Sequence, residues 1–388
     1  MNQRKMVFAQ IMDFASQDVF RNIVNRYDGN YMKQEFTCWK HFLCMAFGQL
    51  THRESMSDTM LMLRLNQKKL YHLGIGISFD KSTVSRTNET RDWRIFQEFG
   101  MKLIEQAKEL YTGCNQLDID LKNDIFALDS TTVDLCLDVY WWATFRSTKA
   151  AIKIHTLLDC KTSIPEFIFI SEGDVHDVNI LDRISIKKGC YYVMDKAYTD
   201  FKRLYNLHCD GGYFVVRAKS NNKYKIISRK KVDKQTGVKF DQEILLTGFY
   251  SSKNYPKTIR RVKYYDAEFK RTFIFLTNNK KIKALTVALL YKCRWYVEIF
   301  FKWIKQNLKV LSFWGQNENA VRIQIWIAIS TYVIVAIAKK KLNIPHSLYE
   351  ILQFISIAPF EKEPLHKIFN RELFQEMHCE SDIQLEIF

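Results

Sequence analysis

The sequence predicts an α/β protein in which an all-helical N-terminal domain precedes a mixed α/β domain. Apolar residues recur at helical spacing up to about residue 115. From about residue 120 to 220, β-type runs alternate with short helical segments, which is typical of a mixed α/β domain. A basic β-rich segment follows at 221–282, and two helices at 283–345 complete the domain. A helical tail at 346–388 ends the chain.

Composition indicates a folded protein with a polyanionic partner. The chain has 388 residues, of which 47% are hydrophobic, and its formal net charge is +16, an excess that favours nucleic acid. Nine scattered cysteines without a CxxC motif give no support to a zinc ribbon and indicate reduced thiols. The N-terminus lacks the apolar core of a signal peptide, and Ile325–Ala338 is too short to span a bilayer and predicts a buried helix. We therefore expect a cytoplasmic, nucleoid-associated protein with no membrane partner.

One stretch of the helical domain has two interpretations. A turn with Gly74 and Gly76 precedes a helix start rich in small hydroxyls, Lys and Arg, between Lys81 and Arg91. Such a helix is what a helix-turn-helix offers to a DNA groove. The alternative is a surface helix capped by Ser82 or Thr83.

Five strands are expected in the α/β segment, and two of them end their apolar runs in an aspartate. The runs are DIFALDSTTVDLCLD, KAAIKIHTLLD, PEFIFISEG, CYYVMDKAYTDF and GYFVVRAKS. Asp129 follows the apolar part of the first run, and Asp195 follows that of the fourth. A single Asp at such a place is more often a turn or cap residue. If the two strands are neighbours in one sheet, however, the two carboxylates converge.

The segment 221–281 holds 16 Lys or Arg against 5 Asp or Glu. Lysine protects the edge strands of sheets from aggregation, and this is one explanation. An excess of this size favours the other, a nucleic-acid surface.

The stretch Tyr291–Lys309 predicts one uninterrupted, largely buried helix, because it contains no Gly or Pro and is apolar on most sides. At about 100° per residue, five polar side chains share an arc of about 80°: Tyr291, Arg294, Glu298, Lys302 and Lys305. They could pair with one another at i,i+4 spacing. One carboxylate among a majority of cations also suits a metal-bound phosphate, with Glu298 on the metal and the cations on the phosphates.

Three acids without a Cys or His cluster point to a hard cation. Oxygen ligands from Asp129, Asp195 and Glu298 suit Mg²⁺ or Mn²⁺. Two such ions, about 3.5–4 Å apart, activate a water or a 3′-hydroxyl and stabilise the leaving oxygen of a phosphodiester. Because crowded carboxylates repel one another, we expect binding to be weak until metal and DNA are both present.

At these residues the sequence resembles the DDE transposases of bacterial insertion sequences. Tyr291, Arg294, Glu298 and Lys305 fit the Y-x2-R-x3-E-x6-K signature of the insertion-sequence-four family at every position. The segments FALDSTTVDLCL, AIKIHTLLD, GDVHDVNILD, YYVMDKAYTDF and FLTNN resemble other blocks of that family, in order. The resemblance covers about residues 120–345, and the N-terminal region resembles the helical domain of one subgroup. One departure is Lys196-Ala197, where relatives often carry Arg and Gly.

The resemblance implies an RNase H-like catalytic core with a β-rich insertion. It also implies that Asp129, Asp195 and Glu298 are the metal-binding triad, and that Tyr291, Arg294 and Lys305, with Lys302 beside them, contact the transposon end. Trp295 and one aromatic of the RTFIFLTNN strand, Phe273 or Phe275, would stack on a base flipped from that end.

The function that these expectations favour is cut-and-paste transposition. The protein would bind terminal inverted repeats as a homodimer, nick double-stranded DNA with two Mg²⁺ or Mn²⁺ ions, and join the 3′ ends to target DNA. Two alternatives stay open: a structure-selective nuclease on the same core, and a DNA-binding protein derived from a transposase that no longer cuts. The intact signature and the presence of all three acids favour the first function.

Overall fold

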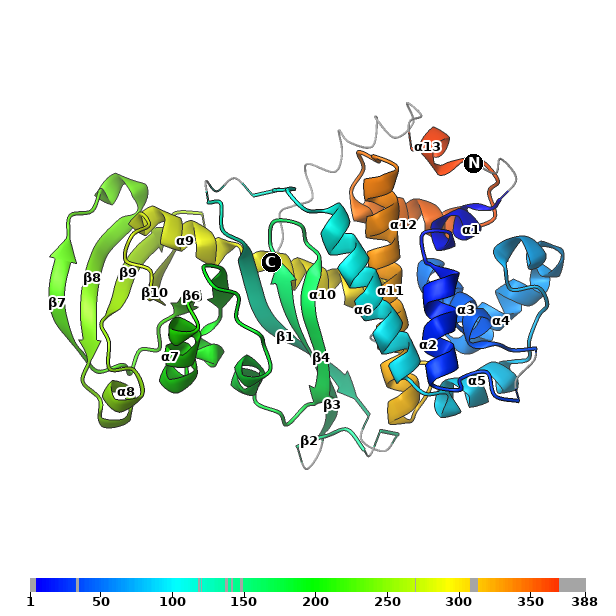
Figure 1. The fold of residues 1–388 in the computed structure, drawn as a ribbon, viewed down its shortest axis with the longest axis horizontal. Coiled ribbons are helices and arrows are strands. Elements are labelled where there is room, and N and C mark those ends of the chain that lie inside the picture. Colours follow the sequence, from blue (N-terminus) through cyan, green and yellow to red (C-terminus); the bar gives the residue numbers. More distant parts are fainter. Residues whose placement is uncertain are drawn as a thin grey trace. The chain divides into compact units, whose positions relative to one another are not determined.

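A computed structural model describes residues 5–32, 35–117, 119, 121–136, 139–140, 142–146, 149–268, 270–307 and 313–369. The chain forms two compact units (Figure 1). One combines Met1–Thr112 with Lys302–Phe388, and the other is Gly113–Phe301. The segment from Lys302 to residue 345, expected with the α/β domain, thus groups with the N-terminal helices.

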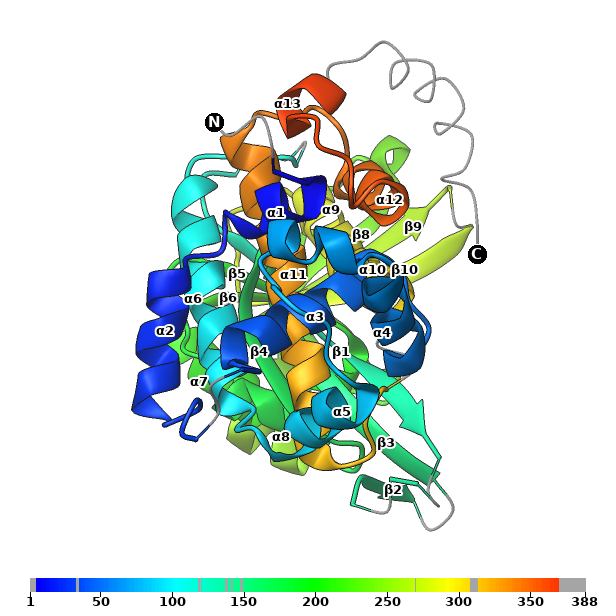
Figure 2. The same cartoon turned by 90° about the vertical axis from the view of Figure 1, so that its right-hand side faces the viewer.

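The first unit is all-helical, as predicted for the N-terminal region. Its long helix α11 packs against α6, α3 and α5, and Figure 2 shows α3 crossing in front of α11. The apolar repeat WRIFQEFGMKLIEQAKEL lies on α6 and faces α11, which buries Trp326 completely. The helices are α1 (Val7–Met12), α2 (Gln17–Arg26), α3 (Cys38–Leu50), α4 (Met56–Leu65), α5 (Lys81–Thr90), α6 (Arg94–Leu110), α11 (Glu318–Lys341), α12 (Leu348–Ile357) and α13 (Leu365–Ile368), with 3₁₀ turns η1 (Gln67–Lys69) and η2 (Tyr71–Leu73).

Helix α11 confirms the buried helix predicted around Ile325–Ala338. It is the one helix among the described residues that is long and apolar enough to cross a membrane, but 94% of its apolar window is buried inside the protein. A core helix passes the same test of length and composition. The helical tail predicted at 346–388 is represented by α12 and α13, and its last 19 residues lie outside the described part.

The N-cap of helix α5 lies two residues before Ser82 and three before Thr83, the two predicted caps. Its N-cap is Asp80, so Ser82 and Thr83 lie within the first turn and the prediction that one of them caps the helix is wrong. Val84, Thr87 and Asn88 form the buried face, and Lys81 and Arg86 stay exposed. This division leaves a polar face available, and the DNA-groove interpretation stays a prediction.

The second unit is built on one ten-stranded sheet of order β2-β3-β1-β5-β6-β10-β9-β8-β7, with β4 paired to β3. Strand β1 is antiparallel to β3 and parallel to β5, and β5 is parallel to β6. The five strands predicted for the α/β segment are β1, β3, β4, β5 and β6. The strands are β1 (Ile125–Leu135), β2 (Thr144–Arg146), β3 (Lys149–Asp159), β4 (Pro165–Glu172), β5 (Tyr191–Met194), β6 (Tyr213–Arg217), β7 (Tyr224–Lys230), β8 (Val238–Leu246), β9 (Ile259–Asp266) and β10 (Arg271–Thr277).

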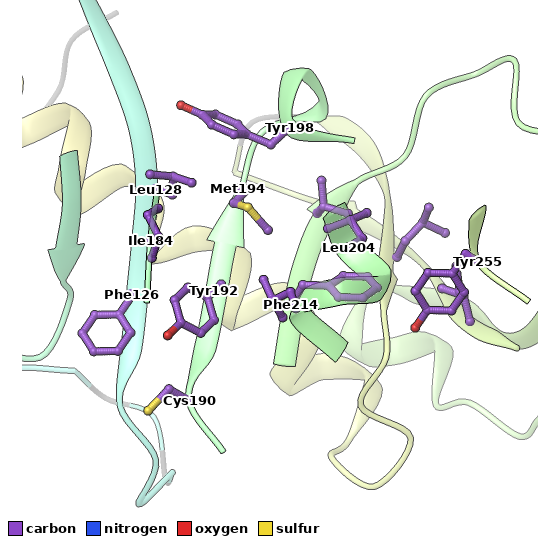
Figure 3. Close-up of a cluster of buried hydrophobic side chains, with 14 of the residues drawn as sticks. Phe126, Leu128, Ile184, Cys190, Tyr192, Met194, Tyr198, Leu204, Phe214 and Tyr255 are labelled. Atoms are coloured by element: carbon purple, nitrogen blue, oxygen red, sulfur yellow. The ribbon is translucent and has the colours of Figure 1, made fainter. Parts of the chain in front are cut away.

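Alternation along the strands places an apolar core on one face of this sheet. Figure 3 shows Phe126 and Leu128 of β1 on the same side as Tyr192 and Met194 of β5. Helix α7 (Phe201–Cys209) and the 3₁₀ segment η3 (Asp177–Asp182) supply buried leucine and isoleucine side chains to the same cluster. Side chains one position further along, Asp129 among them, therefore lie on the opposite face.

The basic β-rich segment continues the core sheet, because β10 pairs antiparallel with β6. Its interior holds a buried ion pair: the Arg260 guanidinium contacts both carboxylate oxygens of Asp241, at 2.9 and 2.8 Å. In the FLTNN block, Asn278 donates to the Gly212 carbonyl and Asn279 to the Tyr191 hydroxyl, which fixes the return from the segment. Strand β7 is the sheet edge, and its exposed Lys and Arg residues fit edge protection without testing nucleic-acid binding.

The predicted helix Tyr291–Lys309 is in fact two helices, and the prediction of one uninterrupted helix is wrong. Helix α9 (Ala284–Lys292) ends with Cys293 as its C-cap, and α10 (Trp295–Asn307) begins two residues later. At the junction the Arg294 N–H donates to the Tyr291 carbonyl, three residues back, so the chain tightens locally. A contact from elsewhere in the fold lies at this junction, where the Cys160 thiol donates to the Cys293 carbonyl at 3.5 Å. Lys309 lies outside the described residues.

Candidate active site

The register of β1 and β5 brings the first two acids together. Leu128 of β1 is paired with Met194 of β5 in parallel. Asp129 and Asp195 are the residues that directly follow this pair. The expectation that these strands are neighbours is confirmed. The buried part of β1 ends at Leu128, directly before Asp129, although the strand itself continues to Leu135, whereas β5 ends directly before Asp195.

The α9–α10 junction brings the third acid to the same place. Arg294 lies at the junction, and its Nη1 is 2.7 Å from Oδ2 of Asp129. Its Nη2 is 2.5 Å from Oε1 of Glu298, one turn along α10. The expected i,i+4 pair of Arg294 and Glu298 is therefore present, and the same guanidinium also holds the acid of β1.

Burial and neighbouring charges perturb the groups at this place. Burial raises the pKa of Asp129 to about 6, against the opposing effects of Arg294 and of the Ser130 N–H, and the charges of Glu298 and Asp195 raise it further. Burial lowers the pKa of Arg294, but Asp129 and Glu298 more than compensate, so the net shift is upward. Arg294 thus remains a cation that offsets part of the repulsion among the acids.

The acids suit a hard cation in chemistry, although they do not form a finished site. Within the described residues, no three Asp, Glu, His or Cys side chains are grouped so that they could hold a metal ion as they stand. Arg294 occupies the space between Asp129 and Glu298, and one oxygen of Asp195 accepts from the Ala197 N–H at 2.8 Å. Mg²⁺ and Mn²⁺ bind carboxylate oxygens, which Asp129, Asp195 and Glu298 supply. By donor type the three acids therefore fit such an ion, and Arg294 is the cation that lies between Asp129 and Glu298 in this structure.

Aromatic side chains lie beside the acids. Phe275 is buried and packs at a tilt against Tyr291 with ring centroids 4.6 Å apart, and Phe273 lies parallel to Phe275 and is only partly buried. The Arg217 guanidinium lies over Phe273 at 5.4 Å. Trp295, the first residue of α10, is 55% exposed. Phe273 and Trp295 therefore present aromatic surface to solvent, whereas Phe275 does not.

Comparison with known proteins identifies the family. Residues 120–334, more than half of the chain, match the transposase DDE domain. The chain belongs to this family of DDE transposases. Residues 3–76 match a second domain family, of unknown function (DUF4372).

Three relatives of this transposase are named as transposases, and two of them are named for insertion sequence elements. A Sinorhizobium fredii protein named as transposase y4zB is 31% identical over 247 residues, which cover 62% of this chain and 68% of the relative. A Synechocystis protein named for insertion sequence element IS4SA is 28% identical over 329 residues, 81% of this chain and 87% of the relative. A Geobacillus stearothermophilus protein named for element IS5377 is 28% identical, covering 71% and 73%. These names and the domain match confirm a bacterial insertion-sequence transposase and fit the insertion-sequence-four branch.

Two further predicted contacts of the transposase lie on the second half of α10. Lys302 is exposed and Lys305 is partly buried. Both belong to the first compact unit, whereas the three acids belong to the second. Their role at the DNA end stays a prediction.

Sequence analysis missed a polar cluster of the transposase on the other face of β1. The Ser130 hydroxyl donates to Oδ1 of Asp177 at 2.7 Å, and Lys153 Nζ is 3.3 Å from the same oxygen. The completely buried His155 lies 3.9 Å from it. The available signal is the block GDVHDVNILD, which contains Asp177.

Arg217 was also missed. It ends β6, in the run GYFVVRAKS, and its charge is among those that act on the pKa of Tyr291. A cation that ends a strand beside the one that leads to Asp195 was the available signal.

Proposed function

We propose that this transposase binds the terminal inverted repeats of its insertion sequence and catalyses metal-dependent DNA cleavage followed by strand transfer. The observation that carries the proposal is the convergence of Asp129 and Glu298 on Arg294, directly beside Asp195. The mixed sheet, with one acid on β1 and one after β5, supports an RNase H-like core.

Asp129, Asp195 and Glu298 would hold the ions. Bound Mg²⁺ or Mn²⁺, two ions in this proposal, supplies Lewis acidity to the scissile phosphate and lowers the pKa of an attacking water or 3′-hydroxyl. Arg294 compensates the carboxylates before metal arrives and is then free to contact a phosphate oxygen. Tyr291 would contact the DNA end beside Arg294, and its ring packs against Phe275.

The DNA partner is supported by charge and exposed rings. The net charge is +16, and the 221–282 insertion carries the largest excess of cations in the chain. We assign end recognition to the helical domain at 1–115, chemistry to 120–220 with 283–345, and leave the 346–388 tail without a role. Pairing of two ends calls for a homodimer, and DNA as substrate places the protein with the nucleoid in the cytoplasm.

The test is cleavage in vitro of duplex DNA carrying the element's own ends, with Mg²⁺ or Mn²⁺, by wild type and Glu298→Ala. We expect end-specific cutting that Glu298→Ala abolishes while end binding persists. Glu166→Ala is the matched control, because Glu166 is a carboxylate outside the three acids, on β4, where it pairs with Lys187.

Other outcomes separate the alternatives. Cutting of branched or nicked DNA without joining to a target would favour the structure-selective nuclease. End binding without cutting by the wild type, with either metal, would favour a non-catalytic DNA-binding protein.

A further inference from the structure

Asp129 lies where β1 loses one of its two neighbours. Pairing with β5 ends at Leu128, whereas pairing with β3 on the other side continues to Leu135. The Asp129 carboxylate accepts from the N–H of Ser130 at 2.9 Å. Arg294 holds the other oxygen, so the direction of this carboxylate depends on Arg294 and on the backbone at Ser130, in a part of the strand that the sheet holds from one side.

A contact on the opposite face compensates for the lost neighbour. The Ser130 hydroxyl donates to Asp177, the first residue of η3. Lys153 contacts Asp177 and donates to the Val175 carbonyl at 2.8 Å, which fixes the chain just before η3. The side chains of Lys153 and Asp177 are only 12% and 28% exposed. Because their charges cancel, the contact anchors Ser130 without adding net negative charge near the acids.

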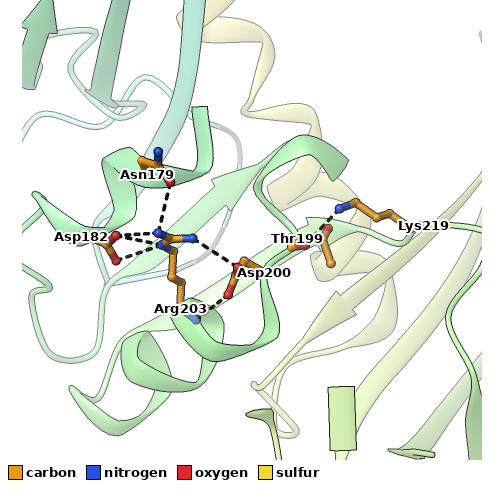
Figure 4. Close-up of polar contacts among 6 residues, drawn as sticks. All are labelled: Asn179, Asp182, Thr199, Asp200, Arg203 and Lys219. Carbon is orange, nitrogen blue, oxygen red and sulfur yellow. Dashed lines mark hydrogen bonds and ion pairs between the residues drawn. The ribbon is translucent and has the colours of Figure 1, made fainter. Parts of the chain in front are cut away.

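The other end of η3 is tied to the segment that carries Asp195. Arg203 of α7 contacts Asp182 at 2.7 Å and Asn179 at 3.1 Å, and its Nη1 reaches Asp200 at 3.2 Å (Figure 4). Asp200 caps α7 and follows Asp195 by five residues. Arg203 thus links Asp182, the last residue of η3, to Asp200, the N-cap of α7.

Lys219 fixes the chain between Asp195 and Asp200. Lys219 Nζ donates to the Thr199 carbonyl at 3.1 Å, which Figure 4 shows beside the Arg203 contacts. Thr199 directly follows η4 (Lys196–Tyr198), the short turn that Asp195 caps. The segment that follows Asp195 is therefore held at Thr199 by Lys219 and at Asp200 by Arg203.

We propose that η3 is a brace between the two aspartates, and that Asp177 and Arg203 are positioning residues that set the geometry of Asp129 and Asp195 for metal binding. This inference rests on the proposed function, which makes these aspartates metal ligands. Groups behind metal ligands commonly change metal affinity by about 10–100-fold when they are removed. Two groups that act through one shared contact give non-additive effects.

The experiment measures Mn²⁺ affinity by electron paramagnetic resonance, with a duplex of the element's end bound. We expect Ser130→Ala and Asp177→Ala each to weaken Mn²⁺ binding about tenfold, and the double variant to bind no more weakly than either single one. Asp177→Asn keeps an acceptor for the Ser130 hydroxyl and should bind nearly as tightly as wild type. Additive losses in the double variant would overturn the proposal, because the two groups would then act separately.

Arg203→Ala tests the other end of η3 and should also weaken Mn²⁺ binding. Its matched control is Arg183→Ala, since Arg183 closes the same segment but stacks on Phe169 instead of bridging to α7. Thermal unfolding of each variant separates loss of fold from loss of geometry. An equal loss of Mn²⁺ affinity in the control would overturn the role of Arg203.

Asp129→Ala distinguishes failure of this inference from failure of the proposed function. If Asp129→Ala binds Mn²⁺ as wild type does, the metal assignment itself is wrong. If Asp129→Ala loses binding while Ser130→Ala and Asp177→Ala retain it, the metal assignment stands and the brace does not.

Discussion

Arg294 lies between Asp129 and Glu298, with its Nη1 2.7 Å from one carboxylate and its Nη2 2.5 Å from the other. The three side chains are 19%, 18% and 34% exposed. One guanidinium therefore compensates two of the three acids in the arrangement without metal. The proposed function also expects this residue at the DNA phosphate.

Arg294→Gln should destabilise the metal-free protein. Removing one partner of a fully buried pair costs about 3–5 kcal/mol, and partial exposure here reduces the expected cost to about 1–3 kcal/mol. Mn²⁺ should then raise the unfolding midpoint of the variant more than that of wild type, because the ion no longer competes with Arg294. Urea unfolding with and without Mn²⁺ measures both effects. Equal Mn²⁺ stabilisation of the two proteins would show that Arg294 does not stand in the metal's place.

His155 should make stability depend on pH. Burial lowers the pKa of His155 to about 4 from 6.5, although the Asp177 charge opposes this. Between pH 6.5 and 4 the unfolded chain binds a proton that the folded protein does not, so this group's contribution to stability falls as pH falls. The loss is about 1.4 kcal/mol per pH unit and about 3 kcal/mol in all.

His155→Gln is the matching variant, because Gln can still bond to Ser171 as the imidazole does at 2.9 Å. The difference in unfolding free energy between wild type and variant should shrink between pH 6.5 and 4. Urea titrations at several pH values measure this difference. A constant difference across that range would contradict a neutral, buried imidazole.

Phe273 and Phe275 should separate into a DNA contact and a core residue. Phe275 is 1% exposed and packs on Tyr291, so Phe275→Ala should cost about 3–5 kcal/mol of stability. Phe273→Ala should change stability little and weaken binding of the cleaved end, since this ring is partly exposed beside Arg217. Gel-shift assays and urea unfolding on both variants test the division. The reverse pattern would assign the stacking role to Phe275.

Trp295→Ala should weaken end binding without changing the fold. The ring is 55% exposed, and stacking of one base on an aromatic ring contributes about 1–3 kcal/mol. We expect a loss of about 5–100-fold in affinity for an end with an unpaired terminal base, and a smaller loss for a fully paired end. Tyr349→Ala, at a ring 49% exposed on α12, is the control and should bind as wild type. Equal losses for both kinds of end would argue against stacking on a flipped base.

Much of this architecture could be predicted from local pattern. The strands that carry Asp129 and Asp195 were recognisable because their apolar runs are buried on both faces of a central sheet. Glu298 was recognisable because a charged stripe on an apolar helix needs partners. The buried helix α11 followed from its length and composition.

Tertiary structure decided which partners these residues have. The break between α9 and α10 contains no Gly or Pro, so no local signal announced it, and it lies where Cys160 contacts the Cys293 carbonyl from across the fold. The fusion of the basic strands with the core sheet depends on the pairing of β10 with β6, about sixty residues apart in sequence.

The sequence by itself therefore determined the candidates for the chemistry of this transposase: the three acids, the cations beside them, and the strands and helix on which or next to which they lie. The contacts of Arg294 with two acids were decided only by the fold, as were the contacts of η3 with Ser130 and Arg203. The physical reason is that apolar periodicity is a local property of the chain, whereas the partner of a buried charge is set by packing among segments distant in sequence.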